Sequence, residues 1–161
     1  MPFTPFHFGP GAFVKSIIPR YFSFTLFALT QVFIDCETLY YILMNEMPLH
    51  RFFHTYIGAN FVLILAVLMG RPISQWILKI LNIQSKITLK CAIITGIIAT
   101  YSHVFLDSIM HYDIKPFAPI SASNPMLEII DIGLLHLLCI ACGFVGVMVF
   151  LIYYATQRER V

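Results

Sequence analysis

The sequence predicts an all-α integral membrane protein, a compact bundle of four to five membrane helices with one interfacial amphipathic helix. Two observations lead to this prediction. Apolar residues make up 59% of the 161 residues and charged residues only 11%, too few to cover the surface of a soluble protein. The apolar residues also gather in five segments that prolines and charges separate. At this length residues 1–161 are expected to form a single membrane-embedded domain.

The first two apolar segments are short. Residues 4–18 are expected to start with Thr4 as the N-cap and Pro5 as the first helical residue, and Pro10 should kink or delay the helix. Residues 21–34 form the second segment. Each would be about 14 residues and roughly 21 Å long, whereas a hydrocarbon core is about 30 Å thick. These segments are therefore expected to tilt or to form a re-entrant hairpin.

Three further segments follow. The third covers residues 52–69 and is expected to end at Gly70-Arg71-Pro72. Residues 73–81 resemble a short amphipathic helix whose tryptophan and lysine suit the headgroup region. The fourth segment spans residues 89–110 and the fifth residues 126–154, with a proline-rich loop between them.

The distribution of charges predicts the orientation of these segments. The connector over residues 71–90 holds only basic charged residues, so it should be cytoplasmic. The connector over residues 35–51 holds three acids and one arginine, and it should face outward together with residues 112–125. The predicted location is a bacterial inner (cell) membrane with several passes.

Metal-competent side chains recur in the fourth segment. His103, Asp107 and His111 follow one another at spacings of four, which places them on one face of a helix. Ionisable groups at membrane depth are costly and indicate function by default. An imidazole and a carboxylate one turn apart can bind one divalent cation. The alternative is a metal-free polar stripe that is hydrogen-bonded between helices.

Further histidines and acids fall at the same, outward end of the predicted topology. Two lie beside the second and third segments and one near the N-terminus, so the predicted metal ligands are His7, Asp35, His54, His103, Asp107 and His111. Groups expected to join or to hydrogen-bond these ligands are Glu37, His50, Glu128, Asp131 and His136. Arg51 could contact an anionic group of a substrate. Residues 1–161 are thus predicted to be one membrane-embedded metal-binding helical domain, and Zn²⁺ is the expected cation.

Several stretches resemble the YdjM/YbcI-type bacterial family of small inner-membrane proteins, which are described as metal-dependent hydrolases. The resemblance lies in residues 1–11 (MPFTPFHFGPG), 50–55 (HRFFHT) and 102–107 (SHVFLD), followed by residues 116–120 (PFAPI). It covers most of the chain. It implies a membrane-bound hydrolase with a metal centre that faces the periplasmic or extracellular side.

The order of the ligands is also similar to that of zinc-dependent phospholipases C and single-strand nucleases. Those proteins hold three zinc ions on helical scaffolds with ligands in the order shown here by His7, Asp35, His54, His103, Asp107 and His111. They also carry a later histidine four residues before an acid, and nothing after His136 fits that pattern. One or two ions are therefore expected, with three as the upper limit.

The sequence thus predicts a membrane-bound metal-dependent hydrolase with phosphoesterase-like chemistry. Metal-activated water would attack an ester or phosphoester of an amphiphilic, lipid-like substrate at the outer face of the membrane. Two alternatives stay open: a small ion or proton transporter, and a non-catalytic membrane scaffold that a metal stabilises. Membrane lipids and an amphiphilic small molecule are the expected partners. Nucleic acid is not expected, since the net charge is only +2.

Overall fold

The computed structural model describes residues 5–158, and the predicted N-cap Thr4 lies outside them. The prediction of an all-α fold is confirmed in this part of the chain. A 3₁₀ turn and a π-helical turn accompany the α-helices, and the elements in order are η1 (Pro5–His7), α1 (Phe8–Ile17), α2 (Phe24–Leu43), α3 (Tyr56–Leu65), η2 (Ala66–Gly70), α4 (Arg71–Ile80), α5 (Leu89–Met110) and α6 (Ile132–Arg158).

Four helical stretches are long and apolar enough to cross a membrane. They are Phe24–Leu43, Tyr56–Ile80, Leu89–Met110 and Ile132–Tyr153. Helix α1 has only 10 residues, which corresponds to about 15 Å of helix. Pro10 lies in the first turn of α1, where a missing N–H costs no hydrogen bond, and the 3₁₀ turn η1 precedes this helix.

The predicted end of the second segment near residue 34 is wrong. Helix α2 has 20 residues and continues to Leu43, so it is long enough to cross and forms no short re-entrant arm. Its start is fixed by Ser23, whose Oγ accepts a hydrogen bond from Leu26 N at 3.3 Å. Asp35 does not end the helix, because its carboxylate lies among polar partners inside the bundle.

The predicted break at Gly70-Arg71-Pro72 is also wrong. Helix α3 passes through the π-helical turn η2 into α4, and Arg71 N donates to Ala66 O across that turn. Pro72 then falls in the first turn of α4, where a proline is tolerated. The amphipathic stretch is therefore the end of a membrane-length helix: Ser74 and Leu78 are buried, and Trp76 is 63% exposed.

The last helix starts at Ile132, later than the predicted residue 126. Asp131 supplies the cap, because its Oδ1 accepts a hydrogen bond from Leu134 N at 3.0 Å. The residues between Pro125 and Asp131 form turns instead of helix. The fourth helix, α5, has the predicted bounds.

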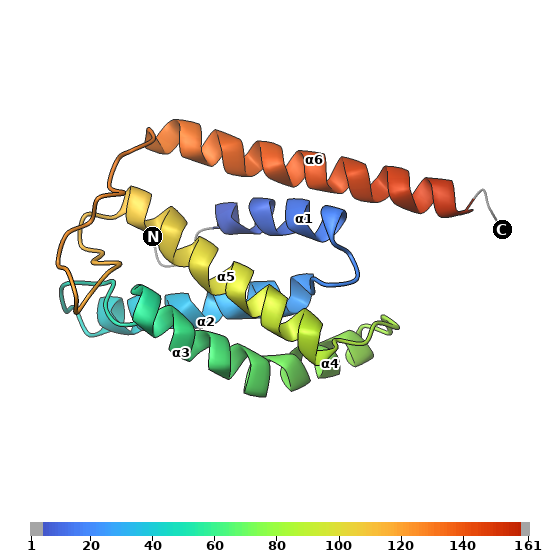
Figure 1. The fold of residues 1–161 in the computed structure, drawn as a ribbon, viewed down its shortest axis with the longest axis horizontal. Coiled ribbons are helices and arrows are strands. Elements are labelled where there is room, and N and C mark those ends of the chain that lie inside the picture. The colour runs from blue at the N-terminus through green and yellow to red at the C-terminus, as the bar shows by residue number, and fades with distance from the viewer. Residues whose placement is uncertain (1–4, 159–161) are drawn as a thin grey trace.

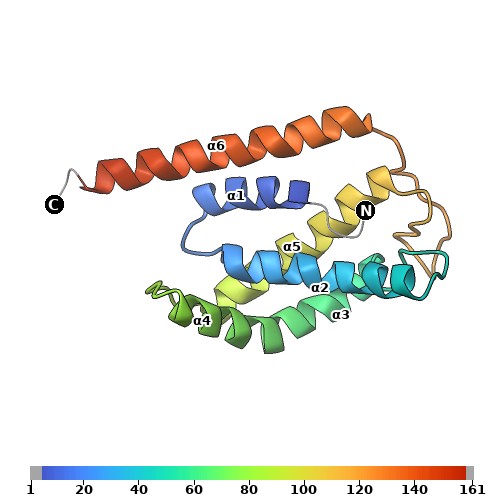
Figure 2. The ribbon, with the colours of Figure 1, turned by 180° about the vertical axis from the view of Figure 1, so that it is seen from behind.

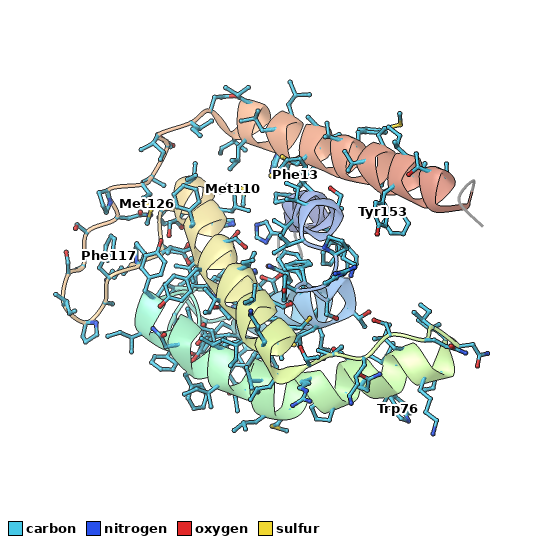
Figure 3. The ribbon with its side chains drawn as sticks, turned by 45° about the vertical axis from the view of Figure 1, so that its right-hand side comes forward. Phe13, Trp76, Met110, Phe117, Met126 and Tyr153 are labelled. Carbon is cyan, nitrogen blue, oxygen red and sulfur yellow. The ribbon has the colours of Figure 1, made fainter. Side chains whose placement is uncertain are left out.

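The helices form an antiparallel arrangement in which α2 and α5 run opposite to α1, α3 and α6 (Figure 1). Helix α1 lies between α6 and the remaining helices, and the view from behind shows the same order (Figure 2). The packing of α1 on α6 brings backbones together, since a Cβ at Gly9 would lie 1.9 Å from Cys139 O. A Cβ at Gly146 would lie 2.6 Å from the backbone nitrogen of Phe13, a residue that points toward α6 (Figure 3). This contact fixes the position of η1 and so of His7.

The connecting loops gather at two opposite ends of the bundle (Figure 1). At one end the Lys15 ammonium donates to Phe22 O at 2.8 Å, and the Lys90 ammonium lies 4.7 Å from the centre of the Tyr21 ring. At the other end Tyr56 N donates to Pro116 O at 2.9 Å, which ties the α2–α3 loop to the α5–α6 loop. Basic residues of α4, of the connector after it and of the start of α5 lie at the first end, namely Arg71, Lys79, Lys86 and Lys90. The predicted ligands lie toward the second end.

Candidate metal centre

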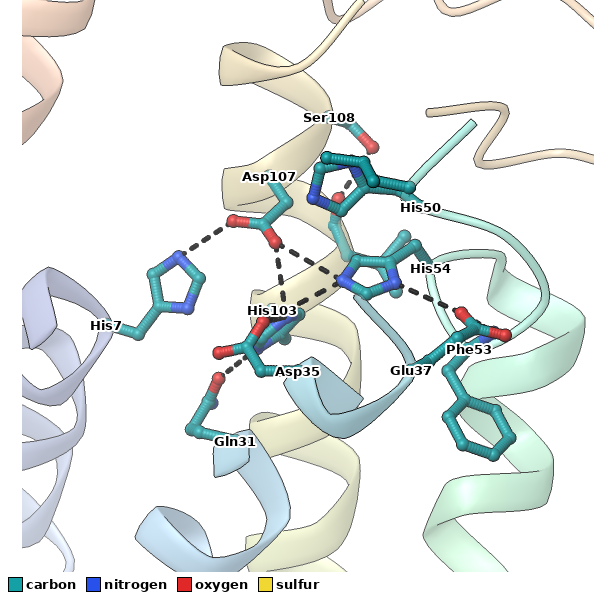
Figure 4. A network of polar contacts seen from close by, with 12 residues as sticks. His7, Gln31, Asp35, Glu37, His50, Phe53, His54, His103, Asp107 and Ser108 are labelled. Atoms are coloured by element: carbon teal, nitrogen blue, oxygen red, sulfur yellow. Dashed lines mark hydrogen bonds and ion pairs between the residues drawn. The ribbon is translucent and has the colours of Figure 1, made fainter. Parts of the chain in front are cut away.

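Four of the predicted ligands converge inside the bundle: Asp35 from α2, His54 from the residues before α3, and His103 and Asp107 from α5 (Figure 4). All four side chains are buried, and His54 and His103 are both 0% exposed. One ligand atom from each lies within 4.8 Å of the other three. We call these four residues the inner cluster.

The spacing inside the inner cluster suits one small cation. His103 Nε2 lies 3.2 Å from Asp107 Oδ2 and 3.4 Å from Asp35 Oδ1, and His54 Nε2 lies 3.5 Å and 4.0 Å from the same two oxygens. Ligands around a tetrahedral zinc at about 2.0–2.1 Å are about 3.3 Å apart. Both Nε2 atoms lie at ion-pair distance from Asp107 Oδ2, but among the described residues neither has a partner with hydrogen-bond geometry.

The opposite nitrogens of both rings are occupied. His54 Nδ1 lies 3.3 Å from Glu37 Oε2, and His103 Nδ1 contacts Gln31 Oε1. The Gln31 amide in turn donates to Ala99 O at 3.1 Å, which fixes its orientation. An imidazole that donates from Nδ1 presents the lone pair of Nε2, as histidines that bind metals do. Both Nε2 atoms face Asp35 and Asp107 (Figure 4).

Local hydrogen bonds hold His54 in place. Glu37 Oε2 also accepts from Phe53 N at 2.9 Å and from Arg51 N at 3.3 Å, so one carboxylate orders the residues around the ligand. Thr55 directly follows His54 and caps α3, since its hydroxyl accepts from Gly58 N at 2.9 Å. The start of α3 therefore determines where the imidazole lies.

His7 joins the inner cluster through Asp107. Its Nε2 lies 3.1 Å from Asp107 Oδ1, whereas Asp107 Oδ2 faces His54 and His103. His7 is 2% exposed, and neither of its ring nitrogens has a hydrogen-bond partner. Asp107 Oδ1 also lacks one, so its contact with His7 does not have hydrogen-bond geometry. His7 could therefore add a ligand on the second oxygen of Asp107.

His111 does not continue the face formed by His103 and Asp107. Helix α5 ends at Met110, and His111 has extended backbone angles, φ −116° and ψ 121°. Its ring lies 4.3 Å from the His50 ring, and His50 Nδ1 lies 2.8 Å from Asp113 Oδ1. One ligand atom from each of His50, His111 and Asp113 lies within 4.8 Å of the other two. We call these three residues the outer cluster.

The other residues predicted beside the metal lie outside both clusters. Glu128 is exposed and its N–H donates to Ile109 O at 3.0 Å, while Asp131 caps α6. The His136 ring stacks on the Phe6 ring at 4.1 Å. These contacts give the three residues roles in folding the α5–α6 loop and the N-terminal turn.

Arg51 is engaged within its own loop. Its Nη2 lies 2.9 Å from Glu46 Oε2, its Nε donates to Pro48 O at 2.9 Å, and its guanidinium lies 3.6 Å from the centre of the Tyr41 ring. These contacts engage Nε and Nη2, and Arg51 also lines a groove together with His50 and Asp113, so its contact with a substrate anion stays a prediction. Arg51 thus shapes the loop that carries His50 and His54.

The histidines outside the membrane-spanning helices differ in pKa. Burial would lower the pKa of His54, but the Asp107 and Glu37 carboxylates outweigh burial and raise it above the ordinary value. Burial, together with the nearby His54 and His111, lowers the pKa of His50 to about 4. Burial also lowers the pKa of His111. The two histidines of the outer cluster are therefore neutral at pH 7, which is the form that binds metal.

No protein-family model, curated protein or solved structure matches this chain. The buried inner cluster could hold a metal ion, and the four long apolar helices could cross a membrane.

Sequence reasoning missed Gln31 and Asp113. Gln31 precedes Asp35 by four residues and so shares its helix face, a signal that was present. Asp113 lies past the end of α5, where no periodicity points to it.

Proposed function

We propose that this protein is a membrane-bound metal-dependent hydrolase that uses a divalent cation, most simply Zn²⁺, at the inner cluster. The observation that carries the proposal is the pair of buried Nε2 atoms of His54 and His103. They have no hydrogen-bond partner, they face two carboxylates, and their rings are held from behind by Glu37 and Gln31. Two imidazoles and two carboxylates are a donor set that suits zinc.

A bound divalent cation would act as a Lewis acid and would lower the pKa of a coordinated water toward neutrality. The residues of this chain supply the remaining functions. The carboxylates of Asp35 and Asp107 balance the positive charge in a buried site. His7 lies at Asp107 Oδ1 with both ring nitrogens free of hydrogen bonds, so it could take up a proton or hold a second ion.

A groove of about 550 Å³ lies beside the candidate centre and supports an amphiphilic substrate. His50 and Asp113 of the outer cluster line it, together with apolar side chains such as Phe52 and Ile57. Lys115, which is exposed, also lines the groove and offers a positive charge. Apolar walls with a cation near the polar end suit a lipid-like ester or phosphoester.

The proposal also covers the membrane in which the protein lies and the family to which it belongs. We place the protein in a bacterial inner membrane, with the end that carries Arg71, Lys79, Lys86 and Lys90 in the cytoplasm. The metal centre would then face the periplasmic or extracellular side. Membership in the YdjM/YbcI-type family is part of the same proposal and rests on the three sequence stretches described above.

One observation favours a second candidate, a metal that only stabilises the fold. Four protein ligands fill a tetrahedral shell, as in structural zinc sites, whereas catalytic sites usually have three ligands and an open position. The contact between His54 Nε2 and Asp35 Oδ1 is the longest of the four, at 4.0 Å. If Asp35 did not bind the ion, the three remaining ligands would leave an open position for water, as the hydrolase requires.

Transport is less well supported. Buried hydroxyls do continue along α2 and α5 from the inner cluster toward the basic end. The hydroxyl of Thr30 donates to Leu26 O at 2.8 Å, and that of Thr100 donates to Gly96 O at 3.0 Å. These groups bond to their own helices, so they do not form a relay for ions or protons.

The test combines metal content with a hydrolysis panel on detergent-purified protein. The probes are p-nitrophenyl phosphate, bis(p-nitrophenyl) phosphate, p-nitrophenyl butyrate and a fluorescent phospholipid. We expect hydrolysis that zinc restores after chelation and that Asp107→Asn abolishes, while Asp131→Asn, at an exposed helix cap, retains it. Bound zinc that raises the melting temperature without hydrolysis of any probe would favour the scaffold. Failure to bind zinc or manganese would refute both candidates.

A further inference from the structure

The outer cluster brings together three metal-competent side chains that the proposed centre does not use. His50 comes from the α2–α3 loop, and His111 and Asp113 follow the end of α5. His50 is buried like the residues of the inner cluster, whereas His111 and Asp113 are only half-buried. Two imidazoles and a carboxylate within 4.8 Å of one another match the ligands of a three-coordinate protein site with an open position.

Backbone contacts fix the ligands of the outer cluster. Asp113 Oδ2 accepts hydrogen bonds from Leu49 N at 2.9 Å and His50 N at 3.1 Å, which leaves Oδ1 directed at the His50 ring. His111 N donates to Asp107 O at 2.9 Å, so the last turn of α5 holds this residue. Among the described residues, no lysine or arginine forms an ion pair with Asp113.

The two clusters are neighbours. The rings of His50 and His54 meet edge to face with centroids 4.7 Å apart, so one ligand of each cluster touches the other cluster. The groove described above reaches the outer cluster through His50 and Asp113, whereas the inner cluster lies behind it. A ligand in the groove would therefore meet the outer cluster first.

We propose that His50, His111 and Asp113 bind a second divalent cation, next to the first and facing the groove. This inference rests on the proposed hydrolase and deepens it. Paired cations stabilise both the attacking oxygen and the leaving oxygen when a phosphoester is hydrolysed, so a second ion here would make a phosphoester the substrate class in preference to a carboxylic ester. Lys115 on the groove wall suits the same anionic group.

The experiment measures zinc equivalents by mass spectrometry and by titration on the full-length protein in detergent, with Zn²⁺ alone as the probe. We expect two equivalents in the wild type and one in His111→Ala and in Asp113→Asn. His136→Ala removes a histidine that stacks on Phe6 outside both clusters, and it should keep two. His103→Ala should lose the inner ion, which identifies that equivalent separately.

A cysteine variant reports ligation directly. Thiolate is a zinc and cadmium ligand. In a Cys36→Ala background, His111→Cys should restore the second equivalent that His111→Ala lacks, and with Cd²⁺ it should show a near-ultraviolet sulfur-to-metal charge-transfer band that the Cys36→Ala parent does not show. If His111→Ala unfolds and loses both ions, the cadmium band in His111→Cys decides: its presence supports the second site, and its absence overturns it.

Different results would refute the second metal site and the proposed hydrolase. A wild type that saturates at one equivalent, lost in His103→Ala and kept in His111→Ala, would overturn the second site and leave the inner centre standing. Two equivalents retained in both His111→Ala and Asp113→Asn would also overturn it. A wild type that binds no zinc would remove both the second site and the proposed hydrolase.

Discussion

His54 Nδ1 lies 3.3 Å from Glu37 Oε2, and this contact turns the other nitrogen of the ring toward Asp35 and Asp107. The same carboxylate oxygen also accepts from Phe53 N and Arg51 N. Glu37 therefore orients a ligand without facing the other carboxylates of the inner cluster. Outer partners of this kind set the tautomer and the basicity of a metal-binding histidine.

Glu37→Gln tests this relationship. The amide keeps the size of the side chain but loses the charge that strengthens the hydrogen bond to His54. Zinc affinity should fall about 10–100-fold, the usual effect of losing such an outer partner. A competition titration with a chromogenic chelator measures it. Glu46→Gln is the matched control, since Glu46 pairs with Arg51 at the exposed edge of the same loop, and its zinc affinity should be unchanged.

Asp107→Asn should have a larger effect than Glu37→Gln. Asp107 is the residue that faces His7 with one oxygen and His54 and His103 with the other. An asparagine presents only one oxygen and no charge, so neither side retains a carboxylate ligand. Zinc should raise the melting temperature of the variant by less than it raises that of the wild type, because only the outer cluster would still bind the ion and a ligand stabilises only the state it binds. A rise equal to that of the wild type would show that Asp107 is no ligand.

Much of the fold was readable from the sequence, and the end of α2 shows why part of it was not. The bounds of α5 follow from a long apolar run with a clear loop on either side. The apolar run stops at Ile34, so local hydropathy places Asp35 at the membrane edge, whereas partners on α5 let this acid lie within α2. Partners that come from distant segments cannot be inferred from local hydropathy.

The site was predictable in part for a similar reason. The spacing of His103 and Asp107 places both in the inner cluster, but His111 belongs elsewhere because the helix ends one residue before it. Helix ends are the least certain feature of a periodic pattern. Asp113 acquires its place from hydrogen bonds to residues 49 and 50, which are distant in sequence.

The pH dependence of stability should differ between the metal-free and the zinc-bound protein. The pKa of His54 is raised above its ordinary value of 6.5. Its protonated form therefore stabilises the metal-free fold below pH 6.5, and that contribution is lost as the pH rises through the raised pKa. Zinc must displace this proton, so its affinity should rise over the same range.

Thermal unfolding with chelator or with saturating zinc, at a series of pH values, measures this difference. The melting temperature of the metal-free protein should fall above pH 6.5, and the stabilisation by zinc should grow. His54→Gln should flatten the slope of the metal-free protein. Parallel pH profiles with and without zinc would contradict competition between the proton and the metal at His54.

Gly146→Ala should destabilise the contact between α1 and α6. A Cβ at this position would lie 2.6 Å from Phe13 N and 2.7 Å from the carbonyl carbon of Ala12, and backbone atoms cannot move aside as a side chain can. Overpacking of this kind costs about 1–3 kcal/mol. Gly133→Ala is the control, because its Cβ would meet only the Asp131 side chain, at 3.1 Å. The gain in helix propensity is larger at Gly146, in the interior of α6, than at Gly133, in its first turn, so a lower unfolding free energy of Gly146→Ala reports the clash.

The orientation in the membrane can be read from two single-cysteine positions. Ser85 lies in the connector next to Lys86, and Ser123 lies in the α5–α6 loop at the end near the metal centre; both are exposed. Because lysines and arginines favour the cytoplasmic side, Ser85→Cys should react with a membrane-impermeant maleimide only after the cells are permeabilised. Ser123→Cys should react in intact cells, where the reagent reaches the outer face of the membrane. The exposed Cys36 is replaced by alanine in both variants to remove background labelling. Labelling of Ser85→Cys but not of Ser123→Cys in intact cells would show that the protein has the opposite orientation. The metal centre would then serve a substrate on the cytoplasmic side.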